Sequence, residues 1–206
     1  NANGDVKIKD PINDYLILAN DATYYKTLEK IITNGDTEAF IQSRYIIKSK
    51  DITYLHNEKI LSSQEKSKIK DQNSQVYFAE KFKYLINEEI IKGENFLIIT
   101  NYNLPKSDKF FLENGIINLK DKTFVAKDTK IKIHKDIFDN TENDPRLRGV
   151  SSSGDENITI INKGLFTTCK KNDDCPPWSI KATKIKHDKT KKQITYDNAI
   201  IKVKII

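Results

Sequence analysis

The chain of 206 residues lacks methionine entirely and has only seven glycines, five prolines, two cysteines and one tryptophan. So little glycine and proline excludes a collagen-like or low-complexity chain. Because no run of about 18 apolar residues occurs, no segment is expected to span a bilayer as a helix. The missing initiator methionine predicts a processed or engineered start, with Asn1–Gly4 as a tag remnant or a flexible segment.

Side chains that carry catalysis are also scarce. The three histidines, His56, His134 and His187, have no companion at a catalytic or metal-ligand spacing. No His-Glu-x-x-His pair, glycine-rich phosphate loop or Gly-x-Ser-x-Gly turn is found either. We therefore expect no enzyme activity, no cofactor and no metal site.

The net charge of +6 comes almost wholly from lysine, since only three of the 35 basic residues are arginine. The lysines alternate with apolar residues, as in Val6–Lys9 and Ile131–His134. This pattern is typical of solvated strand faces and not of an arginine-rich nucleic-acid surface, so no nucleic acid is expected as a partner. A mild attraction to an anionic partner, such as a phosphorylated glycolipid, is the functional alternative.

A period of two in hydrophobicity runs through most of the chain, and it predicts roughly twenty short strands. Segments rich in turn-forming residues separate them, for example Asn34–Asp36 and Asn114–Gly115. No window keeps a helical period. The prediction is one all-β domain over residues 1–206, in which a long loop over residues 135–155 is the only break.

Three tyrosines, Tyr24, Tyr54 and Tyr84, follow one another at intervals of thirty residues. Each belongs to a unit that reads as an aromatic strand, a charged turn and an isoleucine-rich strand. Such hairpins cannot bury an apolar face singly, so repeated copies are expected to stack into an elongated pair of sheets.

Both cysteines and the tryptophan lie in one stretch between Gly164 and Ile180. The polar connection between Cys169 and Cys175 could bring their Cα atoms within the ~4.4–6.8 Å that a disulfide needs. Closing this loop would stabilise the fold by about 2–3 kcal/mol. Reduced cysteines are the alternative, whereas a zinc site would need further ligands. Trp178 is expected to anchor the core.

The run Gly164–Ile180, followed by Lys186–Lys189 and Tyr196–Val203, resembles the periplasmic domain of the outer-membrane lipopolysaccharide-assembly family that includes LptD, the organic solvent tolerance protein OstA. The segment Pro145–Gly149 and the hairpin repeats resemble the same family. Its bridge protein LptA shares the OstA-type repeat. The resemblance is specific from residue 145 to 206 and diffuse from residue 5 to 134.

The resemblance implies an elongated, twisted open β-jellyroll of stacked antiparallel hairpins that carries lipid acyl chains in an apolar groove without catalysis. It implies a lipopolysaccharide transport module in the periplasm, associated with the outer membrane of a Gram-negative bacterium. An LptA-like bridge protein would pair with an edge strand such as Val6–Lys9. The carboxy-terminal membrane β-barrel and its lipoprotein partner would complete the protein. Because that barrel is absent here, a fragment or a natural short form is expected.

The family's cysteine that pairs with the barrel is best matched by Cys169, whereas Cys175 departs from the family pattern. The resemblance therefore leaves open whether Cys169 pairs with Cys175 or with another domain.

Alternating strands place one apolar face inward, and these faces are the candidate lining of the groove. The candidates are Val6, Ile8, Ile117, Leu119, Phe124, Ala126, Ile131, Ile133, Ala199, Ile201 and Val203. For each of them, packing in a dry core is the alternative. A β-rich adhesion or carbohydrate-binding protein of the cell envelope is the alternative of a different class, since it too would show hairpin repeats and surface lysines.

Overall fold

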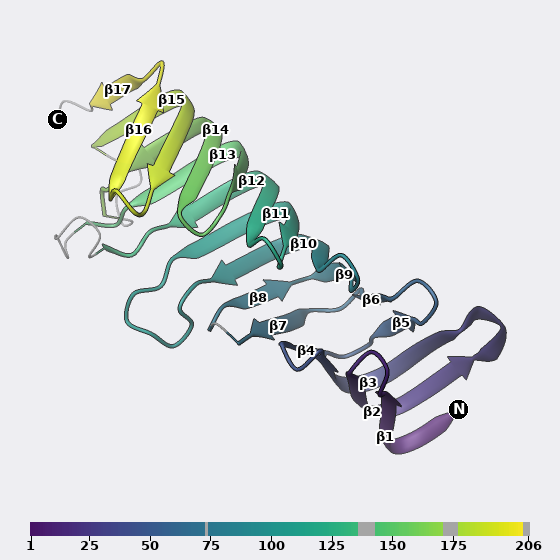
Figure 1. Ribbon diagram of the computed structural model, residues 1–206. Coiled ribbons are helices and arrows are strands. Elements are labelled where there is room, and N and C mark those ends of the chain that lie inside the picture. The colour runs from purple at the N-terminus through teal and green to yellow at the C-terminus, as the bar shows by residue number, and fades with distance from the viewer. Residues whose placement is uncertain (73, 136–142, 171–176, 204–206) are drawn as a thin grey trace.

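The computed structural model describes residues 1–72, 74–135, 143–170 and 177–203. These residues form seventeen strands and one short 3-10 turn at Lys26–Leu28, so the all-β prediction is confirmed. The strands follow one another in an elongated antiparallel stack, with the N-terminus at one end and β17 at the other (Figure 1). No helix in these ranges is long and apolar enough to cross a membrane.

The strands and their bounds are β1 (Ala2–Asp10), β2 (Tyr15–Tyr25), β3 (Lys30–Ile41), β4 (Tyr45–Ser49), β5 (Thr53–Leu55), β6 (Ile60–Ser63), β7 (Ser67–Asp71), β8 (Val76–Ala79), β9 (Lys81–Leu85), β10 (Ile90–Ile99), β11 (Lys109–Asn118), β12 (Thr123–Lys132), β13 (Arg146–Gly154), β14 (Ile158–Thr167), β15 (Trp178–Asp188), β16 (Gln193–Asp197) and β17 (Ile200–Val203).

Each level of the stack is a rung that bends in its middle and contributes to two layers. In β10, for example, residues 90–94 pair with β9 and residues 97–99 pair with β8. Nine rungs are continuous strands, and four are divided into strand pairs: β4 with β5, β6 with β7, β8 with β9, and β16 with β17. The rung halves that align with β8 form one layer, which we call the β8 layer. The halves that align with β9 form the other, which we call the β9 layer. The inner faces of the two layers enclose the core.

The bends lie at polar residues or glycine, which interrupt the alternation of apolar side chains. From Asp5 through Asn20 and Gly35 to Asn95, they recur at intervals of fifteen residues, and later bends include Asp128. Asn95 and Asp128 have φ values of 51° and 46°. Asn and Asp tolerate positive φ better than other side chains do, so these residues suit a corner in a strand.

Glycine is required on the inside of one such corner. Phe96 is buried there, and a Cβ at Gly93 would lie 2.7 Å from its Cζ atom. A Cβ at Gly115 would lie 3.1 Å from its Cδ2 atom. The two glycines therefore leave the space that the ring fills.

Strand pairing aligns the inward residues into rows that cross the stack. In the β8 layer one row passes through Ile8, Ile17, Ala39, Ile47, Ile69, Tyr77, Ile98, Phe110, Ile131, Leu147, Phe166, Ile180 and Ile201. In the β9 layer a row passes through Tyr24, Ile31, Tyr54, Leu61, Tyr84, Ile91, Ile117, Phe124, Gly154, Thr159, His187 and Ile194. Successive members of the series Tyr24, Tyr54 and Tyr84 therefore lie two rungs apart in this row.

Two segments differ from the sequence-based expectation. The loop expected over residues 135–155 gives way to strand β13 from Arg146, where Leu147 and Ser152 point inward among exposed or half-exposed neighbours. Its serine-rich half lacks the apolar alternation that marks a strand. Residues 2–4, expected to be a tag remnant or a flexible start, belong to β1, and Ala2 pairs with Ala22.

Trp178 is half-buried. Its ring packs edge-on against Phe166, with the two centroids 6.0 Å apart. Cys169 is buried and forms no disulfide with a described residue, and its Sγ lies 3.5 Å from the carbonyl oxygen of Trp178. Cys175 lies outside the described residues, so the Cys169–Cys175 disulfide stays a prediction.

Candidate functional site

The interior between the two layers holds the predicted groove residues in three different environments. In the middle of the stack, five are buried and Phe124 is half-buried against them; the five are Ile117, Leu119, Ala126, Ile131 and Ile133. At the N-terminal end, Val6 and Ile8 are half-buried. At the C-terminal end, Ala199, Ile201 and Val203 are exposed. The structure therefore packs the centre of the interior and leaves both ends accessible.

A cavity of about 590 Å³ opens the interior at its N-terminal end. Its apolar walls come from facing positions of the two layers, with Val6 and Ile8 on one side and Tyr24, Ile31 and Tyr54 on the other. The cavity is therefore the end of the space between the layers.

A second cavity, of about 440 Å³, lies at the side of the stack, where the strand ends of the two layers face each other. We call it the lateral mouth. Its floor includes Ile98, Phe110, Ile117 and Phe124, which belong to the two inner rows. Its rim carries the basic side chains Lys106, Lys122, His134, Lys189 and Lys192 and the acidic side chains Asp108, Asp155 and Glu156.

Ion pairs close the side of the stack by joining a loop of one layer to a loop of the other. Arg44, before β4, lies 2.8 Å from Glu89, before β10. Near the N-terminus, Asp10 lies 3.7 Å from the ammonium group of Lys59. These pairs are partly buried, so the loss of hydration offsets much of their Coulomb attraction, and we expect them to hold the side of the stack only weakly.

Polar groups without a hydrogen-bond partner lie in the inner row of the β9 layer. Among the described residues, the buried atoms without a partner are Tyr54 Oη, Tyr84 Oη, Thr159 Oγ1 and His187 Nε2. Thr159 and His187 are directly opposite on neighbouring strands. Leaving such a group unsatisfied costs about 1–3 kcal/mol, so a bound molecule with matching polar atoms would gain by reaching them.

Burial sets the ionisation of these groups. It lowers the pKa of His187, an effect that the carboxylate of Asp108 opposes, so the imidazole is neutral at pH 7. Burial likewise raises the pKa values of Tyr54 and Tyr84. The inner row therefore carries no charge near neutral pH.

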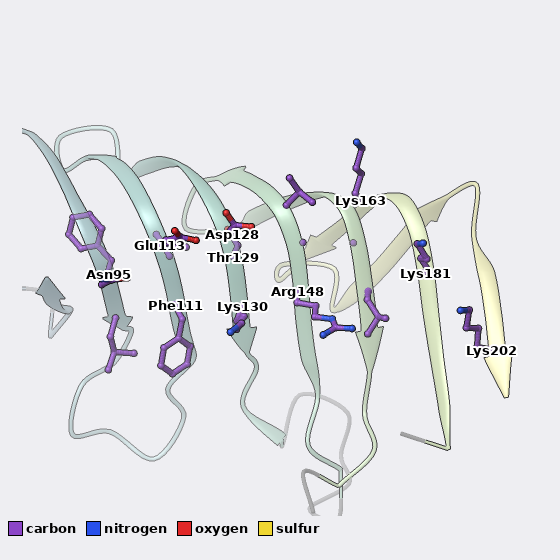
Figure 2. A pocket seen from close by; sticks show the side chains of 17 residues that line it. Asn95, Phe111, Glu113, Asp128, Thr129, Lys130, Arg148, Lys163, Lys181 and Lys202 are labelled. Atoms are coloured by element: carbon purple, nitrogen blue, oxygen red, sulfur yellow. The ribbon is translucent and has the colours of Figure 1, made fainter. Parts of the chain in front are cut away.

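A third hollow, of about 770 Å³, lies on the outer surface of the β8 layer, and we call it the outer groove (Figure 2). Its lining includes five basic residues from five successive rungs: Lys130, Arg148, Lys163, Lys181 and Lys202. The carboxylates that line it belong to Glu113 and Asp128. Apolar contacts come from Leu97, Phe111, Val150 and Leu165.

The sequence alone does not reveal the outer groove, because lysines that alternate with apolar residues are typical of any solvated strand face. The register between strands aligns these cations. Lys130 lies directly opposite Arg148, although thirteen residues connect β12 to β13 in the sequence. Alternation within one strand does not reveal such a pairing.

Side chains that could hold a metal do not gather in the described part of the chain, where no group of three or more His, Cys, Asp or Glu residues is found. Comparison of the chain with protein-family models and with curated proteins finds no match.

Proposed function

We propose that the chain is a non-catalytic transport module that holds the acyl chains of lipopolysaccharide between its two layers and delivers them toward the outer membrane. The inner row of the β8 layer, which runs from Ile8 to Ile201 through every rung, carries this proposal. All of its members are aliphatic or aromatic. A continuous apolar row suits a ligand with long hydrocarbon chains, because burial stabilises by about 25 cal/mol per Å² of apolar surface.

The cavities support access for such a ligand. The N-terminal cavity and the lateral mouth have volumes of about 590 and 440 Å³, within the range of small-molecule sites. Both join apolar walls of the two layers. We propose that acyl chains enter here and that the layers separate further to admit them, since weak ion pairs close the side.

The rim of the lateral mouth suits the polar part of a phosphorylated glycolipid. Lys106 and Lys192 are exposed there beside the apolar floor. Ammonium groups attract phosphates, while the sugar residues would stay in water. An amphiphile would therefore place its chains on Phe110 and Phe124 and its phosphates at the rim.

The two ends of the stack suit protein partners. In the described residues β1 pairs with β2 alone, and β16 and β17 each pair with β15 alone. An unpaired strand edge accepts a further strand. We propose that an LptA-like bridge protein adds to β1 in the periplasm, and that a membrane β-barrel with its lipoprotein partner lies beyond β17.

A photo-crosslinking experiment tests the interior directly. Phe124 and Val125 are neighbours in β12; Phe124 points into the core, whereas Val125 is 61% exposed on the outer surface. The photoreactive residue p-benzoylphenylalanine at position 124 should capture lipopolysaccharide, and at position 125 it should not. Equal capture at both positions, or capture at 125 alone, would contradict binding between the layers.

A further inference from the structure

The outer groove follows one row of outward residues across seven rungs. Directly opposite neighbours in this row are Leu97, Phe111, Lys130, Arg148, Leu165, Lys181 and Ile200. The layer itself separates this row from the interior, since the inner row lies on its other face. The groove is therefore a surface distinct from the lipid-binding interior that we propose.

Like charges meet in the centre of this row. Lys130 and Arg148 face each other directly, and in the next row Lys132 faces both Lys109 and Arg146. Like charges directly opposite in an antiparallel pair destabilise the sheet. The arrangement carries a cost in the free protein that a bound anion would remove.

Carboxylates of the chain offset the charge of the groove only in part, since Glu113 and Asp128 line it beside five cations. No ion pair involves any of the five groove cations within the ranges that the structure describes. Two cations of the next row, Arg146 and Lys132, do have partners. Arg146 lies 3.5 Å from Asp144, and the ammonium of Lys132 lies 5.5 Å from the ring centroid of Phe111. The five groove cations are therefore available to an anion from outside the chain.

The spacing of these cations favours a repeating anionic chain over a single small anion. Neighbouring strands lie ~4.8 Å apart, so Lys130 and Arg148 are one spacing apart, and Arg148 and Lys181 are two. In Figure 2 the basic side chains are distributed along the groove from Lys130 to Lys202 instead of converging on one point. A polymer that crosses the strands would meet one cation after another.

Apolar side chains alternate with the cations along the same path. Phe111 and Leu165 are half-buried members of the row, and Val150 is exposed beside it. The apolar faces of sugar rings can pack on such side chains while their acidic groups reach the lysines. A nucleic acid is less well matched, because one phenylalanine gives no series of stacking platforms for successive bases.

We propose that the outer groove binds an acidic polysaccharide whose chain runs across the strands of the β8 layer. The polymer's carboxylate, phosphate or sulfate groups contact Lys130, Arg148 and Lys181, and its rings pack on Phe111 and Leu165. This inference goes beyond the proposed lipid transport and does not depend on it.

The test uses dextran sulfate as the acidic polysaccharide, with neutral dextran and oligothymidylate as comparison ligands. The groove variant is Lys130→Gln, Arg148→Gln and Lys181→Gln together. The matched control is Lys83→Gln, Lys92→Gln and Lys184→Gln on the β9 layer, where Lys83 and Lys92 also face each other directly. Both variants lose three positive charges at exposed positions, so they change the net charge equally.

Dextran sulfate should bind the unmodified protein, neutral dextran should not, and binding should weaken as salt increases. The groove variant should lose affinity roughly tenfold or more, because three charge contacts disappear. The control variant should lose less than about twofold, through the change in long-range field alone. Phe111→Ala should also weaken the binding of dextran sulfate without affecting the salt dependence.

Three results would overturn the inference. Equal losses in the two triple variants would show binding to the overall positive charge. Tighter binding of oligothymidylate than of dextran sulfate, lost in the groove variant, would assign the groove to nucleic acid. Absence of dextran sulfate binding at low salt would remove the site altogether. In each case lipopolysaccharide capture from position 124 would still report separately on the interior.

Discussion

Lys189 and Asp108 join the two layers across the lateral mouth, where Lys189 Nζ lies 3.7 Å from Asp108 Oδ2. The same ammonium group lies 5.2 Å from the ring centroid of Phe110, on the floor of the mouth. One side chain therefore links the turn after β15 to the loop before β11 and also covers an apolar wall. A molecule that packs on this face of Phe110 would therefore compete with the Lys189 side chain.

Lys189→Gln should make the interior more accessible at a small cost in stability. The ion pair is partly exposed, so we expect its loss to lower the free energy of unfolding by no more than about 1 kcal/mol. Binding of the apolar dye N-phenylnaphthylamine should become faster. Lys122→Gln is the control, because Lys122 pairs with Glu156 within the β9 layer and does not bridge the mouth. Equal acceleration in both variants would argue against a bridge that restricts access.

The hydroxyl of Tyr84 should be dispensable for folding but not for binding. It is buried without a partner, so Tyr84→Phe should leave the free energy of unfolding unchanged or raise it by up to about 1 kcal/mol. Tyr77→Phe is the comparison, since the Tyr77 hydroxyl donates a hydrogen bond of 2.7 Å to Gln75. That variant should be destabilised by about 1 kcal/mol.

Urea titrations of the two tyrosine variants measure these differences. A weaker affinity of Tyr84→Phe for lipopolysaccharide, at unchanged stability, would show that the hydroxyl contacts the ligand. Marked destabilisation of Tyr84→Phe would instead reveal a hydrogen bond that holds the fold.

His187 should make the fold sensitive to acid. Its folded-state pKa lies below the ordinary value of 6.5, because burial disfavours the charged imidazole. The unfolded chain therefore takes up a proton first as the pH falls. The stability that neutral His187 contributes is fully present above about 6.5 and declines below it.

Unfolding of the wild type and of His187→Leu at about pH 7.5 and about pH 5 measures this contribution. The neutral side chain of leucine should reduce the loss of stability between the two values. An identical loss in the wild type and the variant would assign the pH dependence to other groups.

Lys163 is held in a conformation that its side chain disfavours. Its φ of 48° is in the left-handed region at the corner of β14, where a residue with a Cβ costs about 1–2 kcal/mol. Lys163→Gly should therefore raise the free energy of unfolding by about 1 kcal/mol. Lys181→Gly, at a regular strand position of β15, should lower it by about 0.5–1 kcal/mol. Destabilisation by both substitutions would mean that the side chain of Lys163 makes a contact that the corner needs.

Local patterns in the sequence predict the strands of this fold, but they do not predict where the strands bend. Alternation identifies elements such as β12, and the interval between Tyr54 and Tyr84 correctly indicates stacked repeats. The bends at Asn20 and Asn95 lie inside β2 and β10, where a polar residue that interrupts the alternation looks like the end of a strand. The fifteen-residue interval between successive bends, as in Asp5, Asn20 and Gly35, is the pattern in the sequence that locates them.

The position of the groove residues shows a second limit. Whether an inward residue is packed or accessible depends on whether the neighbouring rungs and the opposite layer cover it. Ile131 and Ile201 both point inward in one row, yet Ile131 is 1% exposed and Ile201 is 66% exposed. Ile201 lies on the last rung, whereas rungs on both sides cover Ile131. The alternating pattern around the two residues is the same, so it cannot separate them.

Capture of lipopolysaccharide along the whole stack tests the central claim most directly. Three pairs of neighbours point inward and outward at the two ends and in the middle: Ile8 with Lys7, Phe124 with Val125, and Ile201 with Ile200. With p-benzoylphenylalanine at each position, the inward member of every pair should capture lipopolysaccharide and the outward member should not. Capture that does not distinguish inward from outward neighbours, or that occurs only at outward positions, would contradict an apolar track between the layers.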